Sequence, residues 1–181
     1  FDGQIQKYFF DFFFFLYEKF TVIKVKDKYN LVEYNKQLDF NRKLELKNKI
    51  NIYDGKLNDV GKSETSLSVS WYDKSTRLIK DMVENNAHNY FKNIVKSKSG
   101  DSLWTCYKEY MLDIKSFKKA FVPHNLRATN EYSNTHTLAY LVNRYISPYL
   151  LRYFKNKNIN VNQEIYATSE MIQWIWRSRI R

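Results

Sequence analysis

The order of hydrophobic and polar positions at the start of the chain predicts a hairpin followed by a polar segment. Residues 20–26, FTVIKVK, alternate apolar and polar side chains, which is typical of a half-buried strand. After the polar turn DKYN, residues 31–34 are expected to pair back onto that strand. Residues 39–51 are rich in Lys, Arg, Leu and Glu, which indicates a polar helix or a linker.

Apolar residues at helical spacing, with short strands between them, account for most of the remaining chain. Helices are expected at 71–95, 103–114, 138–154 and 164–181, the third with a kink or joint at Pro148. The core candidates of the first of these helices are Leu78, Ile79, Met82, Tyr90, Phe91 and Ile94. Short strands are expected at 50–53 and 120–122, and loops at 55–70 and 124–135. This order predicts a helix-rich α/β domain over residues 51–181, preceded by an aromatic-rich and basic segment, 1–50.

The final predicted helix, EIYATSEMIQWIWRSRIR, combines an apolar stripe with a face suited to anions. The buried stripe is expected to contain Ile165, Ile172, Trp176 and Ile180. The opposite face is expected to contain Glu170, Gln173, Arg177 and Arg181. Arginine presents a rigid fork of donors that fits phosphate oxygens. The alternative is an ordinary solvated basic face on a packed helix.

The charge of the chain favours a polyanionic partner. Lys and Arg outnumber Asp and Glu by 30 to 19, a formal net charge of +11. Such an excess is typical of proteins that bind nucleic acid or an anionic membrane surface. The strongest apolar run, residues 8–17, contains Asp11 and is about half as long as a membrane span requires. Nucleic acid, DNA or RNA, is therefore the expected partner, and no membrane span is expected.

The cysteine and histidine positions predict a reducing compartment and no metal site. Cys106 is the only cysteine, so the chain can form no internal disulfide. The expected location is the cytoplasm, with the mitochondrial matrix as the alternative. The histidines, at 88, 124 and 136, do not lie at metal-ligand spacing. The first residue is Phe1 rather than Met, which suggests a piece of a larger chain or complex.

Gly61-Lys62-Ser63 resembles the end of a phosphate-binding loop but does not complete one. The full pattern requires a glycine five residues before Gly61, where the sequence has Lys56. No acidic pair follows a hydrophobic strand either. An independent ATPase site is therefore not expected, and the chain alone is predicted to bind no cofactor.

Two further segments contain residues suited to nucleic acid. The loop NLRATNEY, residues 125–132, offers Arg127, Thr129 and Asn130 as donors, although an ordinary loop with an Asx turn is an equal alternative. Tyrosines recur every fourth residue at 145, 149 and 153, beside Arg144 and Arg152. Interleaved aromatic and basic groups can stack bases and hold phosphates. Aromatic residues at this spacing also commonly form a core.

Three segments, LWTCYKEY (103–110), NLRATNEYSNTHTLAYLVNRYISP (125–148) and YATSEMIQWIWRSRIR (166–181), resemble a known family. Their order and spacing are similar to the C-terminal part of DEAD/DEAH-box-like (superfamily 2) helicases of Gram-positive bacteria, phages and mobile elements. The resemblance covers about residues 100–181. It implies a second RecA-like lobe, or a fragment of one, whose first lobe lies outside this chain.

The resemblance implies roles for particular residues. The last helix is similar to the arginine-finger motif, which Gln173 would open, with Arg177 as the first arginine and Arg179 or Arg181 as the second. The glycines usual in that motif are missing here, and Trp176 and Ile180 stand near their places. The loop from Arg127 to Asn130 would couple nucleotide to nucleic acid. ATP with Mg²⁺ would bind only together with the absent lobe.

These observations favour the nucleic-acid-binding lobe of an ATP-dependent helicase or translocase, which supplies arginines to a nucleotide site between lobes. Catalysis is expected only together with the other lobe. One alternative is a non-enzymatic RNA-binding component of a ribosomal or organellar assembly. Another is a phage or plasmid replication protein that binds DNA without NTP.

Overall fold

The computed structural model describes residues 20–26, 28–33, 35–98, 100–114, 120–126 and 131–178. These residues fall into two compact units, which divide between Tyr53 and Asp54. The apolar run 8–17 lies outside the described residues, so its predicted environment stays a prediction.

The N-terminal unit contains the predicted hairpin and one helix. Strands β1 (Phe20–Val25) and β2 (Lys28–Glu33) pair antiparallel, with Val25 opposite Lys28 at the turn. Helix α2 (Lys36–Lys49) follows, and the side chain of Asn35 accepts a hydrogen bond from its first turn. The predicted strand and its antiparallel return are confirmed, although the return begins at Lys28, within the predicted turn, and residues 39–51 lie mainly in a helix rather than in a linker.

The second unit is built on a small parallel sheet. Strand β3 (Ser102–Thr105) pairs in parallel with β4 (Thr137–Tyr140), and Trp104 lies opposite Ala139. On its other side, Trp104 forms a parallel bridge with Phe121 and its carbonyl accepts from the amide of Val122 at 3.0 Å. Strand β3 is therefore central, and the predicted strand at 120–122 contributes this one bridge.

The helix predicted at 103–114 begins with a strand and is wrong there, and the helix predicted at 138–154 is wrong before Pro148 but correct for residues 148–154. Alternate residues of β3 face opposite sides: Leu103 packs with Val122 and Trp174, whereas Trp104 packs with Val83 and Phe91. A strand buried on both faces has no alternation of apolar and polar residues, and its short apolar run cannot be distinguished from a buried helix by period.

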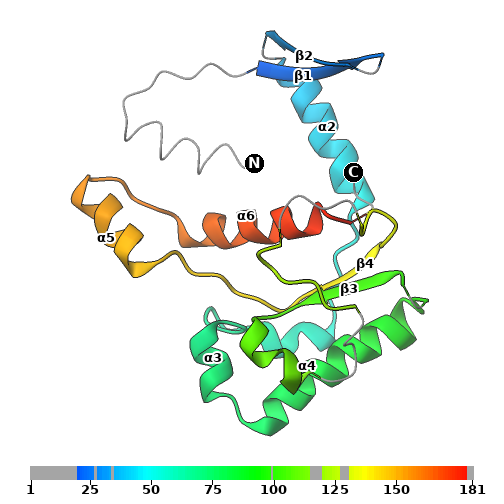
Figure 1. Cartoon of the computed structure of the whole chain (residues 1–181), viewed down its shortest axis with the longest axis vertical. Helices are drawn as coiled ribbons and strands as arrows, with labels where there is room; N and C mark the ends of the chain where they lie inside the picture. The colour runs from blue at the N-terminus through cyan, green and yellow to red at the C-terminus, as the bar shows by residue number, and fades with distance from the viewer. Residues whose placement is uncertain are drawn as a thin grey trace. The chain divides into compact units, whose positions relative to one another are not determined.

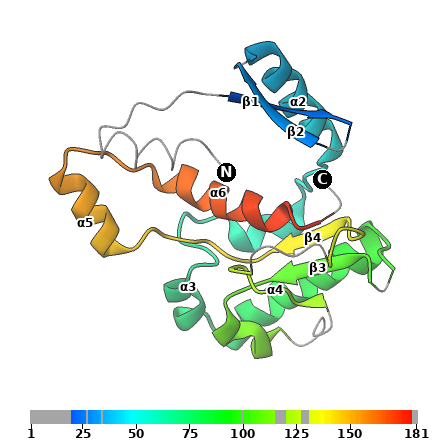
Figure 2. The ribbon, with the colours of Figure 1, turned by 45° about the horizontal axis from the view of Figure 1, so that its top comes forward.

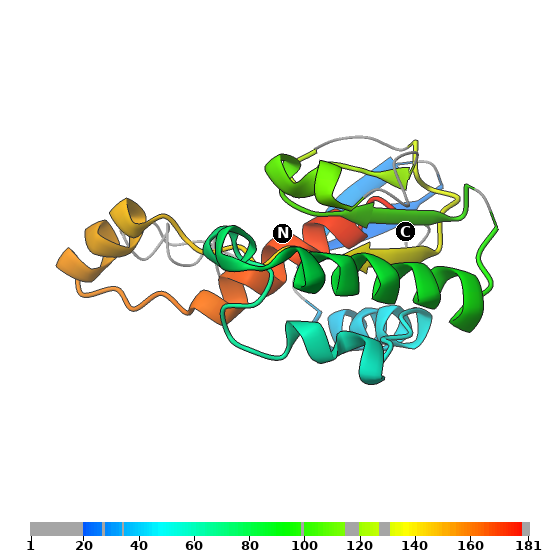
Figure 3. The ribbon, with the colours of Figure 1, turned by 90° about the horizontal axis from the view of Figure 1, so that it is seen from below.

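Helices cover both faces of this sheet. Helix α4 (Arg77–Asn89) continues into a single π-helical segment, η2 (Tyr90–Ile94), and buries Val83 and Phe91 against one face. Helix α6 (Gln163–Ile175) packs Trp174 against the other face. Figures 1 and 2 show α6 and α4 on opposite sides of the strands, and Figure 3 shows α4 running alongside them. The unit is thus a three-layer α/β arrangement.

The helical segments before and after β3 are shorter than the spacing of apolar residues predicted. Two 3₁₀ segments, η1 (Lys56–Gly61) and η3 (Lys108–Asp113), lie on either side of α3 (Val69–Lys74) and α4 along the chain. The predicted helix 71–95 breaks at Ser75, and Thr76 accepts from the amide of Ile79 to cap α4. Of its predicted core, Phe91 is buried, whereas Leu78, Met82 and Ile94 are exposed. Residues 50–53 form no strand.

Helix α5 (Pro148–Asn156) begins where a kink was predicted. Pro148 occupies the first helical turn, where its missing amide hydrogen costs nothing. Residues 141–147 before it belong to neither helix nor strand. Asn162 then caps α6 by accepting from the amide of Ile165 at 3.0 Å.

Candidate functional site

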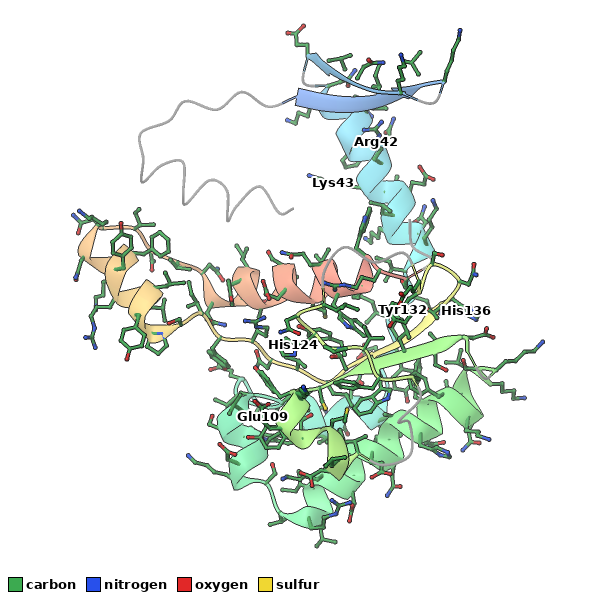
Figure 4. The ribbon with its side chains drawn as sticks, in the orientation of Figure 1. Arg42, Lys43, Glu109, His124, Tyr132 and His136 are labelled. Carbon is green, nitrogen blue, oxygen red and sulfur yellow. The ribbon has the colours of Figure 1, made fainter. Side chains whose placement is uncertain are left out.

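The strands of the second unit end at one edge of the sheet, where β3 leads to Tyr107 and β4 leads to Arg144. In open α/β sheets, ligands bind outside the carboxyl ends of the strands. Figure 4 shows His124 and Glu109 by this end of β3, and Tyr132 and His136 by the other end. We call the group of Tyr107, His124, Tyr140, Arg144 and Glu170 at this end the carboxyl edge.

Tyr107 joins the two strands just beyond their ends. Its hydroxyl donates to the carbonyl of Asn143 at 2.7 Å, and its ring meets the ring of His124 edge-on at 5.2 Å between centroids. Burial raises the pKa of the Tyr107 hydroxyl, and the positive charge of Arg144 opposes that rise. The phenol therefore stays protonated and fixes the backbone beside Arg144.

His124 carries no charge at neutral pH. Burial lowers the pKa of its imidazole, and Arg144 lowers it further. A hydrogen bond to the backbone of Cys106 and the carboxylates of Glu170 and Glu109 act in the opposite direction. The positive charge of the carboxyl edge therefore comes from arginine rather than from histidine.

Arg144 is held from two directions by α6. Its guanidinium Nη1 lies 2.8 Å from Glu170 Oε2, and the two side chains are 29% and 17% exposed. The side-chain amide of Gln163 donates to the carbonyl of Arg144 at 2.7 Å and accepts from the amide of Ile146 at 3.0 Å. The first turns of α6 thus position a partly exposed guanidinium at the end of β4.

Two guanidinium groups act on the same phenol at the end of β4. Burial raises the pKa of Tyr140 above its ordinary range, and Glu170 adds to the rise. Arg144 and Arg177 both lower that pKa. Both cations are therefore within electrostatic reach of Tyr140, although they lie 33 positions apart in the sequence.

The orientation predicted for the last helix is wrong. Ile172 and Trp176, predicted to be buried, are 48% and 41% exposed. Trp174 is buried instead, and its indole donates to the carbonyl of Val122 at 3.2 Å. The indole ring of Trp174 packs on this face of the sheet. This contact, rather than the spacing of apolar residues in the sequence, determines which side of α6 is buried.

Arg177 is buried, contrary to the exposed position predicted for it. Its side chain is 7% exposed, and its Nη1 donates to the carbonyl of Gln173 at 2.9 Å. Helix α6 ends at Ile175, and the turn that follows directs Arg177 and Ser178 inward, with the amide of Arg177 donating to the carbonyl of Trp174. The predicted continuous helix would have left Arg177 on the polar face.

The structure brings some of the predicted site residues together and leaves others apart. Arg144 and Arg177 share the surroundings of Tyr140, and half-buried Gln173 contacts Arg177 through its backbone carbonyl. Arg152 lies on α5, a separate helix. The predicted residues outside the described part of the chain are Arg127, Thr129, Asn130, Arg179 and Arg181.

Sequence reasoning missed Tyr107, His124 and Tyr140 as site residues. Their signal is position, because each lies at or within three residues of the end of a parallel strand or bridge. The prediction of helices at 103–114 and 138–154 hides that signal. Only His124 followed a strand that the sequence predicted.

The Gly61-Lys62-Ser63 segment has the geometry of a surface turn. Gly61 ends η1, and Lys62 Nζ pairs with Asp59 Oδ1 at 2.8 Å. Across the described ranges, no group of three or more His, Cys, Asp and Glu side chains is placed to hold a metal ion. Within the same part of the chain, no helix combines the length and apolar character needed to cross a membrane.

Comparison with known proteins places this architecture in a family. A family model described as the YonV C-terminal Rossmann-like domain matches residues 44–181. The SPbeta prophage-derived protein YonV of Bacillus subtilis (strain 168) is 44% identical over 183 residues, which cover all of this chain and 44% of that protein. The chain thus spans less than half of that relative's length. No solved structure matches the chain. The second unit is a helix-rich Rossmann-like α/β domain on a small parallel sheet, and the chain belongs to the family of the YonV C-terminal Rossmann-like domain.

Proposed function

We propose that this chain contributes one lobe to a nucleic-acid-dependent NTPase of the helicase or translocase kind. In this proposal the carboxyl edge meets the phosphates of a nucleotide that another part of the full-length protein holds. The observation that carries the proposal is the position of Arg144 beyond the end of β4, where Glu170 and Gln163 hold it partly exposed. A guanidinium at the ligand-binding end of a parallel sheet favours an anionic ligand, and arginine fits phosphate oxygens in particular.

Arg144 is the guanidinium that contacts the phosphate in this proposal. It is partly exposed, and its partner Glu170 is a single carboxylate that a more highly charged phosphate can replace. Arginine supplied from a second lobe stabilises the charge that develops on a transferring phosphoryl group. Gln163 keeps the backbone of Arg144 in place during the exchange, because its side-chain amide bonds the carbonyl of Arg144 and the amide of Ile146.

Arg177 has a different part from the exposed arginine finger that the helicase resemblance implies. Its hydrogen bond to Gln173 keeps it on the inner side of α6, and there it raises the positive potential at Tyr140. A buried positive charge acts through a lower effective dielectric than a solvated one does. Arg177 is therefore a positioning and electrostatic residue for Arg144 in this proposal.

ATP with Mg²⁺ would supply the phosphoryl group, and the residues that bind it most tightly would lie outside this chain. Lys62 is paired with Asp59 at the end of η1 and is not placed as the lysine of a phosphate-binding loop. We therefore expect the isolated chain to hydrolyse no ATP.

The test is ATP turnover by the full-length protein in the presence of single-stranded or duplex DNA or RNA. Arg144→Ala should lower kcat by about 100-fold or more, as the loss of a donor to developing charge does. A combined Arg144→Ala/Glu170→Ala variant removes both partners and shows whether an unpaired carboxylate contributes to the loss. Arg77→Ala, which breaks surface ion pairs with Asp81 and Asp113, is the matched control.

Full-length protein that shows no NTP turnover with any nucleic acid would overturn the proposal. Full turnover by folded Arg144→Ala protein would also overturn the assignment of the site. In the first case, salt-dependent binding of RNA would favour the non-enzymatic RNA-binding component.

A further inference from the structure

Helix α5 presents two tyrosines on the side that the domain does not cover. It lies at one end of the second unit, apart from β3 and β4, in Figures 1 and 3. Phe154 is its buried residue. Tyr149 and Tyr153 are 83% and 45% exposed, and they lie one helical turn apart, about 6 Å along the axis. Tyr149 lies on the side of α5 away from Phe154, whereas the ring of Tyr153 meets the ring of Phe154 edge-on at 5.7 Å between centroids and stays partly exposed beside it.

Arg152 lies beside Tyr149 on the exposed side of α5. It follows Tyr149 by three positions and precedes Tyr153 by one, so helical geometry places Tyr149 between Arg152 and Tyr153 around the helix. Its side chain is exposed. We call Tyr149, Arg152 and Tyr153 the α5 face.

The surroundings of the α5 face carry one sign of charge. The sequence has no Asp or Glu between Glu131 and Glu164. The basic residues in that stretch are Arg144, Arg152, Lys155 and Lys157. Since Arg144 pairs with Glu170, Arg152 and Lys155 give α5 itself a positive charge, and the helix contains no Asp or Glu.

We propose that α5 binds single-stranded nucleic acid, with Tyr149 and Tyr153 stacked on bases and Arg152 bound to the backbone phosphate. The inference deepens the proposed function, because it names the part of the chain that holds the strand, and it rests on that function only for the class of partner. Exposed aromatic rings stack on any base, and a basic groove or face tracks the phosphates. A duplex hides its base faces within the stack, so the tyrosines select single strands.

Charge and aromatic geometry distinguish this partner from a protein. An apolar protein partner would leave Arg152 and Lys155 without counter-charges, whereas a nucleic-acid strand supplies one phosphate per nucleotide. An anionic membrane surface is the rival occupant, because Leu150 and Leu151 are also exposed on α5. That rival is an outcome of the experiment below.

The experiment measures fluorescence anisotropy of labelled oligo(dT) with the full 181-residue chain, without nucleotide. Tyr149→Ala should weaken binding by about 5- to 100-fold, the range seen when one stacking ring is lost. Tyr149→Phe keeps the ring and should bind within about twofold of the parent. Arg152→Gln should reduce the slope of log affinity against log salt by about 0.7, the value for one phosphate contact on a single strand. Leu78→Ala, at an exposed apolar position on α4, is the control.

Three results would overturn the inference. The first is unchanged oligo(dT) affinity in Tyr149→Ala protein that melts like the parent. The second is an equal loss of affinity for duplex DNA, since stacking cannot account for it. The third is Tyr149-dependent binding to phosphatidylserine vesicles without Tyr149-dependent binding to oligo(dT). Because the assay contains no NTP, its failure leaves the turnover test of the full-length protein undecided, and the two proposals can fail separately.

Discussion

Helices α5 and α6 follow each other in the chain and both carry aromatic residues, but the basic residues of α5 lie within the helix, whereas Arg177 follows the end of α6. Helix α6 lies on the sheet, buries Trp174, and is followed by a turn that buries Arg177. Helix α5 lies away from the sheet and leaves Tyr149 and Arg152 exposed. The presence or absence of a sheet beneath the helix thus separates aromatic and basic residues that pack into the domain from those that form an exposed surface.

The largest effect expected from this comparison is on stability, at the two tryptophans near the end of α6. Trp174→Ala should lower the free energy of unfolding by about 3–5 kcal/mol, because it empties the contact with Leu103 and Val122. Trp176→Ala, at a partly exposed position, should cost clearly less. Urea denaturation of both variants measures the difference. Equal losses would mean that α6 packs in the orientation that the sequence spacing predicted.

Arg177 and Arg152 should also differ in their effect on stability, by less than the two tryptophans do. Arg177→Ala should lower the free energy of unfolding by about 1–3 kcal/mol, because it removes a buried side chain and leaves the partly buried carbonyl of Gln173 without this donor. Arg152→Ala should change it by no more than about 0.5 kcal/mol, as exposed substitutions usually do. Thermal melts of the two proteins at matched salt compare them. An Arg152 variant that melts lower than the Arg177 variant would contradict the burial of Arg177.

The element that the sequence predicted best is the one with a visible period. The first strand of the hairpin β1–β2 alternates apolar and polar residues, and this alternation indicates a strand. Strands β3 and β4 are covered on both sides, and their apolar runs have no period that separates them from helices. Thr76 caps α4 and Pro148 begins α5. Both residue types are helix-start signals, but each lies inside a longer apolar pattern that predicted one continuous helix.

The candidate site was only partly predictable for the same reason. Arg144 and Arg177 attract notice by residue type alone, but their convergence on Tyr140 depends on which strands are parallel and where they end. Arg177 is buried because α6 ends at Ile175. No residue near Ile175 is a strong helix-ending signal, so the sequence did not predict this end. His124, by contrast, followed a predicted strand and needed only the rule that ligands bind at the carboxyl ends.

The smallest expected effect is on pH dependence, through His124 at the carboxyl edge. Burial lowers the pKa of His124 in the folded protein below the ordinary value of about 6.5. The unfolded chain therefore binds more protons in the window between these two values. Stability is full above about pH 6.5 and declines as the pH falls through that window. His124→Gln should flatten this decline, whereas His136→Gln at the exposed opposite end should leave it in place. A decline unchanged in His124→Gln protein would assign it to another group.

The central claim is that the carboxyl edge acts on the nucleotide while the α5 face acts on the strand. The most direct measurement is steady-state ATP turnover by full-length protein over a titration of single-stranded nucleic acid, for Arg144→Ala and Tyr149→Ala side by side. The account predicts that Arg144→Ala lowers kcat at saturating strand with little change in the half-saturating strand concentration. It predicts that Tyr149→Ala raises that concentration and leaves kcat nearly unchanged. If both variants alter the same constant, or if Tyr149→Ala abolishes kcat at saturation, the division between the two regions is contradicted.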